Sequence, residues 1–92
     1  MKIKMKYFAR MAELVGKREE ELEVEDGILL KDLISFLINT YGKNLQDYLL
    51  DKNTNETKDF FRILINGEVS QIKNVKIEND SEIVIIPPVS GG

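Results

Sequence analysis

The sequence predicts an α+β domain in which a mixed β-sheet packs on one main helix, and three observations lead to this fold class. Short segments near both ends either alternate polar and apolar residues or are wholly apolar, as strands do. One segment between them repeats apolar residues at helical spacing. The chain has 92 residues, of which 42% are hydrophobic, as expected for one globular domain. We expect this domain over residues 1–86, followed by a tail over residues 87–92.

The first expected strand covers residues 2–8, where lysine alternates with apolar side chains. A period of two predicts that Ile3, Met5 and Tyr7 face the core. Residues 10–15 suit a short helix, which glycine ends at position 16.

A second strand is expected over residues 20–25, with Leu22 and Val24 inward and Glu21, Glu23 and Glu25 outward. If it pairs antiparallel with the first strand, its glutamates share one face with three lysines. Such opposite pairs each contribute roughly 0.2–1 kcal/mol and help to set the register. The alternative is that the glutamates form a patch for a partner.

The main helix is predicted over residues 30–41, after a turn at Asp26-Gly27. Its apolar stripe consists of Leu30, Leu33, Ile34, Leu37, Ile38 and Tyr41. This stripe predicts a helix buried on one side, which ends at Gly42. A coiled coil would need a longer repeat. A further short helical turn over residues 44–50 would bury Leu45, Tyr48 and Leu49.

Residues 51–59 are polar and without periodicity, which indicates a loop. Asp51, Asn53 and Asn55 have the spacing with which a calcium loop begins. Glu56 stands where such a loop needs glycine, and Arg62 where it needs a bidentate glutamate. We therefore expect no metal site here.

Two more strands are predicted over residues 60–65 and 82–86. The first of them is followed by the hairpin turn Asn66-Gly67 and by a return strand that begins at residue 68. Both strands are apolar on both faces, which is typical of strands covered on both sides. One helix covers only one face of a sheet, so part of this surface should stay exposed and bind a partner. The residues expected in this patch are Ile86, Val84, Phe60 and Leu64. The alternative is that the loop and the short helices cover the second face.

The last residues have an unusual order, in which an apolar strand runs into Pro87 and Pro88 and the chain ends in two glycines. Proline cannot donate to a sheet and favours an extended backbone, so the strand should end here. Val89 and Ser90 continue this extension. Gly91 and Gly92 lack a Cβ and can enter a slot too narrow for a side chain. Frayed chain ends rich in small residues are the alternative.

Composition excludes several kinds of chemistry. The chain has no cysteine and no histidine, so it lacks thiolate nucleophiles, disulfides and the commonest general base and metal ligands. Its net charge of −3 disfavours binding to nucleic acid. The longest apolar run is far shorter than the roughly 20 residues of a membrane span, and no secretory signal core is evident. We expect a cytoplasmic protein without membrane or nucleic-acid partners.

A hairpin followed by a crossing helix and further strands is the order of the β-grasp, or ubiquitin-like, architecture. Three stretches then show a resemblance to the MoaD/ThiS sulfur-carrier family, and within it to small subunits of molybdopterin synthase. They are residues 7–16 (YFARMAELVG), residues 63–67 (ILING) and residues 83–92 (IVIIPPVSGG). The chain departs from the family in a longer loop at 51–59 and in the turn Asn79-Asp80-Ser81.

The resemblance implies a function for the tail. An E1-like enzyme would use ATP to adenylate the carboxylate of Gly92, and sulfur would replace AMP to give a thiocarboxylate. This group would donate sulfur in molybdenum (or tungsten) cofactor synthesis, inside the large subunit of molybdopterin synthase. The chain itself would bind no cofactor and would not be an enzyme.

Two other functions stay open from the sequence. A ubiquitin-like modifier would use the same tail and would be joined through Gly92 to lysines of other proteins. A β-grasp interaction module would use the folded domain alone. Deleting Gly92 would abolish the first of these two functions and leave the second intact.

Overall fold

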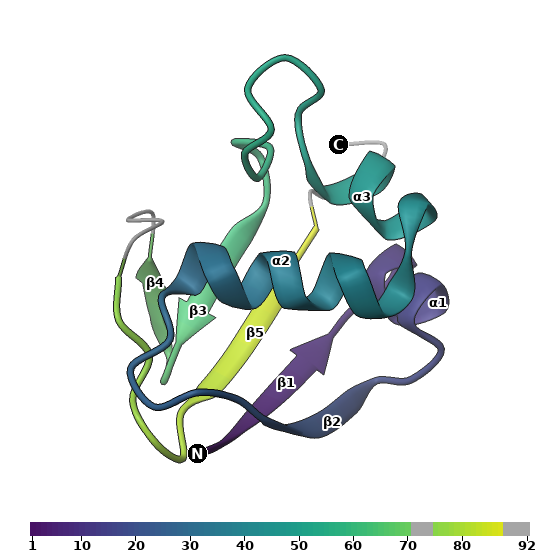
Figure 1. Cartoon of the computed structure of the whole chain (residues 1–92). Helices are drawn as coiled ribbons and strands as arrows, with labels where there is room; N and C mark the ends of the chain where they lie inside the picture. Colours follow the sequence, from purple (N-terminus) through teal and green to yellow (C-terminus); the bar gives the residue numbers. More distant parts are fainter. Residues whose placement is uncertain (71–74, 88–92) are drawn as a thin grey trace.

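The computed structural model describes residues 1–70 and 75–87, which form a sheet with helices gathered on one of its faces (Figure 1). The elements are β1 (Lys2–Tyr7), α1 (Arg10–Val15), β2 (Glu19–Glu23), α2 (Leu30–Tyr41), α3 (Lys43–Leu49), β3 (Arg62–Ile65), β4 (Glu68–Ser70) and β5 (Glu82–Ile86). The strand order in the described sheet is β2-β1-β5-β3-β4. The predicted α+β class, with a mixed sheet on one main helix, is confirmed.

The centre of the sheet determines where the chain leaves the fold. β1 and β5 are parallel, with Met5 opposite Ile83 and Tyr7 opposite Ile85, and the other neighbouring strands are antiparallel. Parallel strands end at the same edge of a sheet. Pro87, which follows β5, therefore lies at the same edge of the sheet as the segment that follows β1.

The predicted lysine–glutamate face exists on β1 and β2. Lys2, Lys4 and Lys6 lie opposite Glu23, Glu21 and Glu19. The prediction that Glu25 belongs to this set is wrong, because β2 ends at Glu23 and the chain has already left the sheet before the turn at residues 26–27. Glu19 takes the third position.

The core lies between α2 and the inner face of the sheet, which is the face that α2 covers. The first four residues of the predicted stripe, Leu30, Leu33, Ile34 and Leu37, are at most 4% exposed. They pack in one cluster with inward side chains of β1 and β5 such as Met5 and Ile83. Burying one such side chain contributes about 1.5–3 kcal/mol. The predicted short helix is also present as α3, in which Leu45 and Leu49 are buried and Tyr48 is half-buried.

The turn at Asn66 and Gly67 supports one edge of this core. Asn66 and Gly67 have φ angles of 52° and 87°, and a type I′ hairpin requires positive φ at both central residues. The side-chain oxygen of Asn66 also accepts a hydrogen bond from the backbone N–H of Glu82 at 2.9 Å. The predicted turn therefore also holds the start of β5.

The third strand is shorter than predicted. Phe60 and Phe61 lie outside β3, because the N–H of Phe61 donates to the carbonyl of Lys58 in a turn. Residues 75–77 lie alongside residues 28–30, with an antiparallel bridge between Lys76 and Leu29. The N–H of Leu30 donates to the carbonyl of Val75, and the N–H of Ile77 donates to the carbonyl of Ile28, both at 2.8 Å.

A polar cluster closes β2 onto the helix layer. Tyr7 and Tyr41 both donate hydrogen bonds to Oε2 of Glu20, at 2.5 and 2.6 Å, and Lys17 lies 3.4 Å from Oε1. Burial, and next the hydrogen bond to Glu20, raise the pKa of Tyr41 to about 12. The same two causes raise the pKa of Tyr7 above its ordinary value. Burial alone would raise the pKa of Glu20, but the two tyrosines and Lys17 outweigh it and lower this pKa. Glu20 is therefore an ionised acceptor at neutral pH.

Candidate docking face and tail root

The outer face of the sheet, opposite α2, carries a row of apolar side chains. On β3 and β5, Ile63 and Ile85 point inward, so Leu64 and Val84 point outward. Leu64 pairs with Val84 on one side and with Val69 of β4 on the other. Ile86 lies two residues beyond Val84 on the same face. We call Leu64, Val69, Val84 and Ile86 the outer apolar patch.

The four side chains of the patch are exposed to different degrees. Val69 is 51% exposed, and Leu64 and Ile86 are half-buried. Val84, which is also predicted to be a partner contact, is 8% exposed. Val84 lies between Leu64 and Lys6 in the sheet, and Lys6 reaches along β5 to Glu82 at 3.3 Å. Its neighbours therefore cover Val84, and it forms the floor of the patch.

Phe60 lies at the edge where β5 ends, and it is 56% exposed. Its ring stacks at 5.4 Å on Phe61, which meets Tyr48 of α3 edge-on at 5.2 Å. Phe61 thus packs against α3, and Phe60 remains accessible. Arg62 pairs with Ile86, which places Phe60 close to the root of the tail.

The sequence interpretation missed three residues around this edge. Phe8 follows β1 and is 49% exposed. It stands where the alternation of that strand would place another lysine. Val69 pairs with Leu64 from β4 and is 51% exposed, but it is not among the residues predicted for the patch. Arg62 is exposed and pairs with the last residue of β5, so it puts a positive charge beside the tail root. The break in alternation at Phe8 was the one signal available in the sequence.

Pro87, at which the tail is predicted to begin, is half-buried and lies outside β5, as its missing N–H predicts. The other predicted tail residues, Pro88, Val89, Ser90, Gly91 and Gly92, lie outside the described residues. The described part of the site is therefore the outer apolar patch, Phe60, Phe8, Arg62 and Pro87.

Asp51 holds the start of the loop at 51–59 through its side chain. Oδ1 of Asp51 accepts hydrogen bonds from the backbone N–H of Asn53 at 2.7 Å and of Thr54 at 3.4 Å. A bridge between Leu50 and Thr57 closes the loop. In the described ranges 1–70 and 75–87, no group of three acidic side chains is placed to hold a metal ion. In the same ranges no helix is long and apolar enough to cross a membrane.

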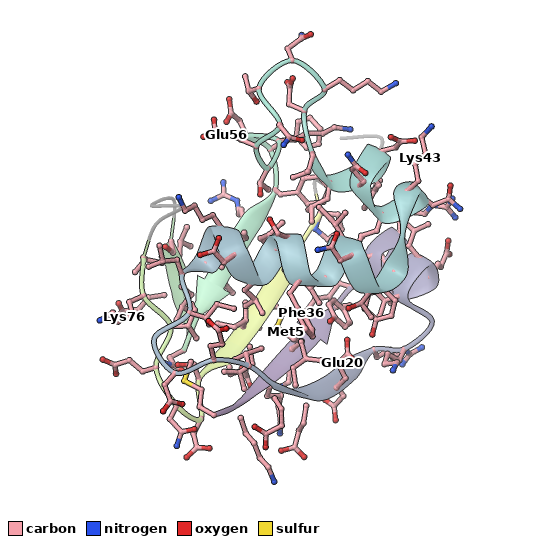
Figure 2. The ribbon with its side chains drawn as sticks, in the orientation of Figure 1. Met5, Glu20, Phe36, Lys43, Glu56 and Lys76 are labelled. Atoms are coloured by element: carbon pink, nitrogen blue, oxygen red, sulfur yellow. The ribbon has the colours of Figure 1, made fainter. Side chains whose placement is uncertain are left out.

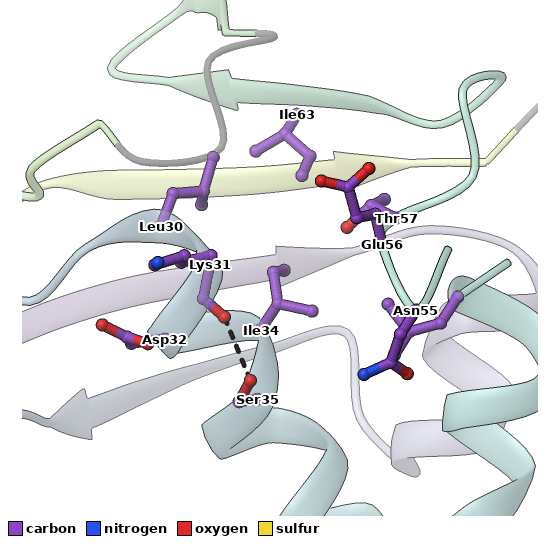
Figure 3. Close-up of a pocket in the computed structure, with 10 residues that line it drawn as sticks. Leu30, Lys31, Asp32, Ile34, Ser35, Asn55, Glu56, Thr57 and Ile63 are labelled. Atoms are coloured by element: carbon purple, nitrogen blue, oxygen red, sulfur yellow. Dashed lines mark hydrogen bonds between the residues drawn. The ribbon is translucent and has the colours of Figure 1, made fainter. Parts of the chain in front are cut away.

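A cavity of about 270 Å³ lies on the other side of the sheet, between α2 and this loop (Figure 3). Leu30, Ile34 and Ile63 form its apolar floor. Because Ile63 points inward, this cavity is separate from the outer apolar patch and from the root of the tail.

The fold and the exposed face define a ubiquitin-like β-grasp protein, and comparison with known proteins gives its family. The chain belongs to the ThiS family, whose sequence model matches residues 5–92. It is similar to small archaeal modifier protein 1 of Haloferax volcanii, with 29% identity over 87 residues, 95% of this chain and 97% of the relative.

Solved structures agree with this family. A crystal structure of the Haloferax volcanii modifier has a TM-score of 0.88 and 26% identity, with all of both chains covered. The putative molybdopterin converting factor subunit 1 of Pyrococcus furiosus has a TM-score of 0.77 and 26% identity, covering 97% of this chain and 99% of that one. The chain is thus a sulfur carrier or small modifier of the ThiS/MoaD kind, without catalytic activity of its own. Carriers of this family work with E1-like activating enzymes and further partner proteins.

Proposed function

We propose that this chain is a sulfur carrier and the small subunit of a molybdopterin synthase, with its reactive group at the carboxylate of Gly92. The supporting observation is the sequence Pro-Pro-Val-Ser-Gly-Gly directly after β5, in a chain whose family match reaches its last residue. The similarity to a putative molybdopterin converting factor subunit favours this pathway.

The chemistry belongs to the chain terminus. The Gly92 carboxylate attacks the α-phosphorus of ATP in an activating enzyme, and pyrophosphate leaves. A sulfur nucleophile then attacks the carbonyl carbon of the adenylate, and AMP leaves with the electron pair of the broken bond. The resulting thiocarboxylate donates its sulfur in the large synthase subunit, where water attacks the carbonyl carbon as the carbon–sulfur bond breaks and restores the Gly92 carboxylate. This sequence needs no catalytic side chain, which agrees with a chain that lacks cysteine and histidine.

The rest of the chain presents this terminus to its partners. In the proposal, residues 87–92 form an extended tail, in which the prolines keep Val89 and Ser90 away from the domain and Gly91 passes through a narrow channel. Both the activating enzyme and the large subunit dock on the outer apolar patch and Phe60. The reaction takes place in the cytoplasm, where ATP is supplied.

The test of this function is sulfur transfer in a reconstituted synthase. Thiocarboxylated chain, the large subunit and the sulfur-free pterin precursor should yield the dithiolene product in proportion to the carrier added. Chain with an ordinary carboxylate at Gly92 should give none, because oxygen replaces the transferable atom. Product from the unmodified carrier would contradict the proposal.

A second candidate is a protein modifier, favoured by the similarity to small archaeal modifier protein 1. In this case a lysine amine attacks the Gly92 adenylate, AMP leaves and an isopeptide bond forms. Mass spectrometry of digested cell extracts separates the candidates, since a Gly-Gly remnant on substrate lysines, lost on deletion of Gly92, would support the modifier. An interaction module would retain its cellular effect when Gly92 is deleted.

A further inference from the structure

The outward side of α2 carries one large apolar residue that the core does not use. Among the described residues, the exposed large apolar side chains are Phe8, Phe36, Phe60 and Val69. Three of them belong to the tail edge or the outer face of the sheet, but Phe36 lies on α2 and is 37% exposed. Figure 2 shows Phe36 leaving α2 toward the side on which Glu20 and β2 lie. Neither the core nor the proposed docking face explains this side chain.

Phe36 lines an open groove of about 710 Å³ between α2 and the segment that joins β2 to α2. Asp32, Ser35, Phe36 and Asn39 form the helical wall, spaced so that they share one face of the helix. Glu23, Glu25 and Asp26 lie along the opposite wall. An aromatic ring is therefore placed in a groove with carboxylates on both sides.

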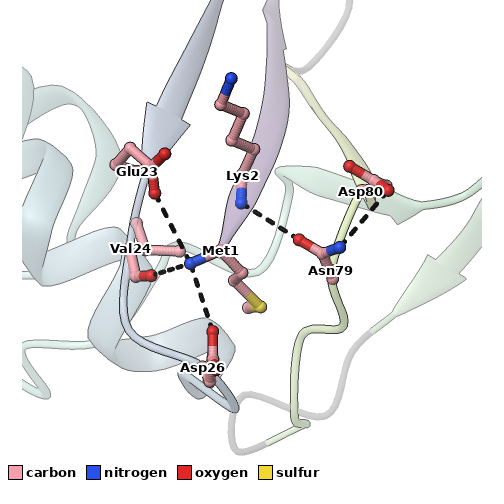
Figure 4. Close-up of polar contacts among 7 residues, drawn as sticks. All are labelled: Met1, Lys2, Glu23, Val24, Asp26, Asn79 and Asp80. Carbon is pink, nitrogen blue, oxygen red and sulfur yellow. Dashed lines mark hydrogen bonds and ion pairs between the residues drawn. The ribbon is translucent and has the colours of Figure 1, made fainter.

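The charge of this groove is only partly balanced within the chain. The amino group of Met1 lies 3.6 Å from Glu23 and 3.2 Å from Asp26, and it donates a hydrogen bond to the carbonyl of Val24 at 2.8 Å (Figure 4). Among the described residues that line the groove, none is lysine or arginine. The Met1 amine thus pairs with Glu23 and Asp26, and Glu23 also lies opposite Lys2 in the sheet. Glu25 and Asp32 lie outside the ion pairs of Met1.

We propose that this groove binds a basic segment of a partner protein, whose lysine or arginine side chains pair with Glu25 and Asp32 and whose apolar side chain packs on Phe36. Charge complementarity selects this occupant, since nucleic acid and anionic membranes would be repelled. The lysine face of a second copy fits poorly, because Lys2, Lys4 and Lys6 already lie opposite glutamates of β2.

The groove is independent of the sulfur-carrier proposal. It lies on the α2 side of the sheet, whereas Leu64, Val69 and Ile86 lie on the outer face. A partner in the groove would leave the outer apolar patch free, so a basic segment could hold the carrier while an enzyme engages its tail. Failure of either proposal leaves the other intact.

The test is an NMR titration of the full ¹⁵N-labelled chain with a short synthetic peptide of alternating lysine and leucine. We expect the largest shift changes at residues 23–39, and affinity that falls as salt rises. Phe36→Ser and Asp32→Asn should each weaken binding about fivefold or more. Glu21→Gln makes the same charge change on the outer face as Asp32→Asn and should leave affinity unchanged.

Three results would overturn the inference. They are no binding, shift changes centred outside residues 23–39, or equal weakening by Glu21→Gln and Asp32→Asn, which would indicate unspecific charge attraction. A peptide with serine in place of leucine should bind more weakly, and equal binding would exclude a contact with Phe36. If Phe36→Ser fails to fold, Asp32→Asn and the serine peptide decide the outcome. The Phe36→Ser chain, where folded, should still acquire the modification at Gly92.

Discussion

Glu20 is the residue whose environment differs most from that of its neighbours in the same strand. Glu19, Glu21 and Glu23 lie opposite lysines on the outer face, whereas Glu20 points to the helix layer and accepts hydrogen bonds from Tyr7 and Tyr41. Its side chain is 12% exposed. One carboxylate thus joins β1, β2 and the end of α2.

Replacing Glu20 with glutamine should destabilise the fold at pH 7 by about 1 kcal/mol, because the charged acceptor becomes neutral. The folded-state pKa of Glu20 lies below its ordinary value of 4.5, so its contribution is present above pH 4.5 and is lost as pH falls through the lowered pKa. Urea unfolding across this range should show the wild type and Glu20→Gln converging at acid pH. Glu21→Gln is the control, with a smaller effect, and a constant difference between wild type and Glu20→Gln would contradict this account.

The loop at 51–57 is ordered by its own backbone contacts. The N–H of Asn55 donates to the carbonyl of Asp51 at 2.7 Å, and the N–H of Asp51 donates to that of Glu56 at 2.8 Å. The spacing of Asp51, Asn53 and Asn55 therefore reflects an Asx turn, which uses the same residue types as a calcium loop.

Asp51→Ala should remove this turn and cost about 1 kcal/mol, since the backbone N–H groups of Asn53 and Thr54 lose their acceptor. Hydrogen exchange at these two amides should become faster, while exchange in α2 stays slow. Asp59→Ala, in the same exposed segment, is the control. Unchanged protection at both amides would show that the carboxylate does not order the loop.

The outer apolar patch is the element on which docking should depend. Val69→Asp places a charge on an exposed position of β4, so the fold should persist while affinity for the activating enzyme falls about tenfold or more. Gln46→Glu adds the same charge on α3 and should bind as wild type does. Calorimetric titration of both variants measures the difference, and equal affinities would remove the patch from the proposed interface.

Patterns within single segments predicted the fold, and contacts between segments limited that prediction. The α2 stripe and the alternation in β1 are visible in the sequence because their periods match one buried face. The register that selects Glu19 instead of Glu25 depends on where β2 leaves the sheet. Val84 is buried between Leu64 and Lys6, its strand partners, which are distant from it in sequence. Both facts appear only when strands are paired.

The candidate site was predictable to a similar extent. The composition of the last residues of the sequence predicted both the apolar second face of β5 and the tail at residues 87–92. Phe8 and Arg62 join the same edge because β1 is parallel to β5 and β3 is antiparallel to it. A linear sequence does not contain that arrangement, so these two residues were missed.

At the scale of the whole molecule, the account requires that the domain presents a reactive terminus and performs no chemistry with its side chains. The most direct measurement is the intact mass of the chain after incubation with its activating enzyme, ATP and a sulfur donor. We predict a product heavier by the exchange of one oxygen for one sulfur, located at Gly92 and absent from a chain lacking this residue. An unchanged mass, or the same gain in the truncated chain, would contradict the account.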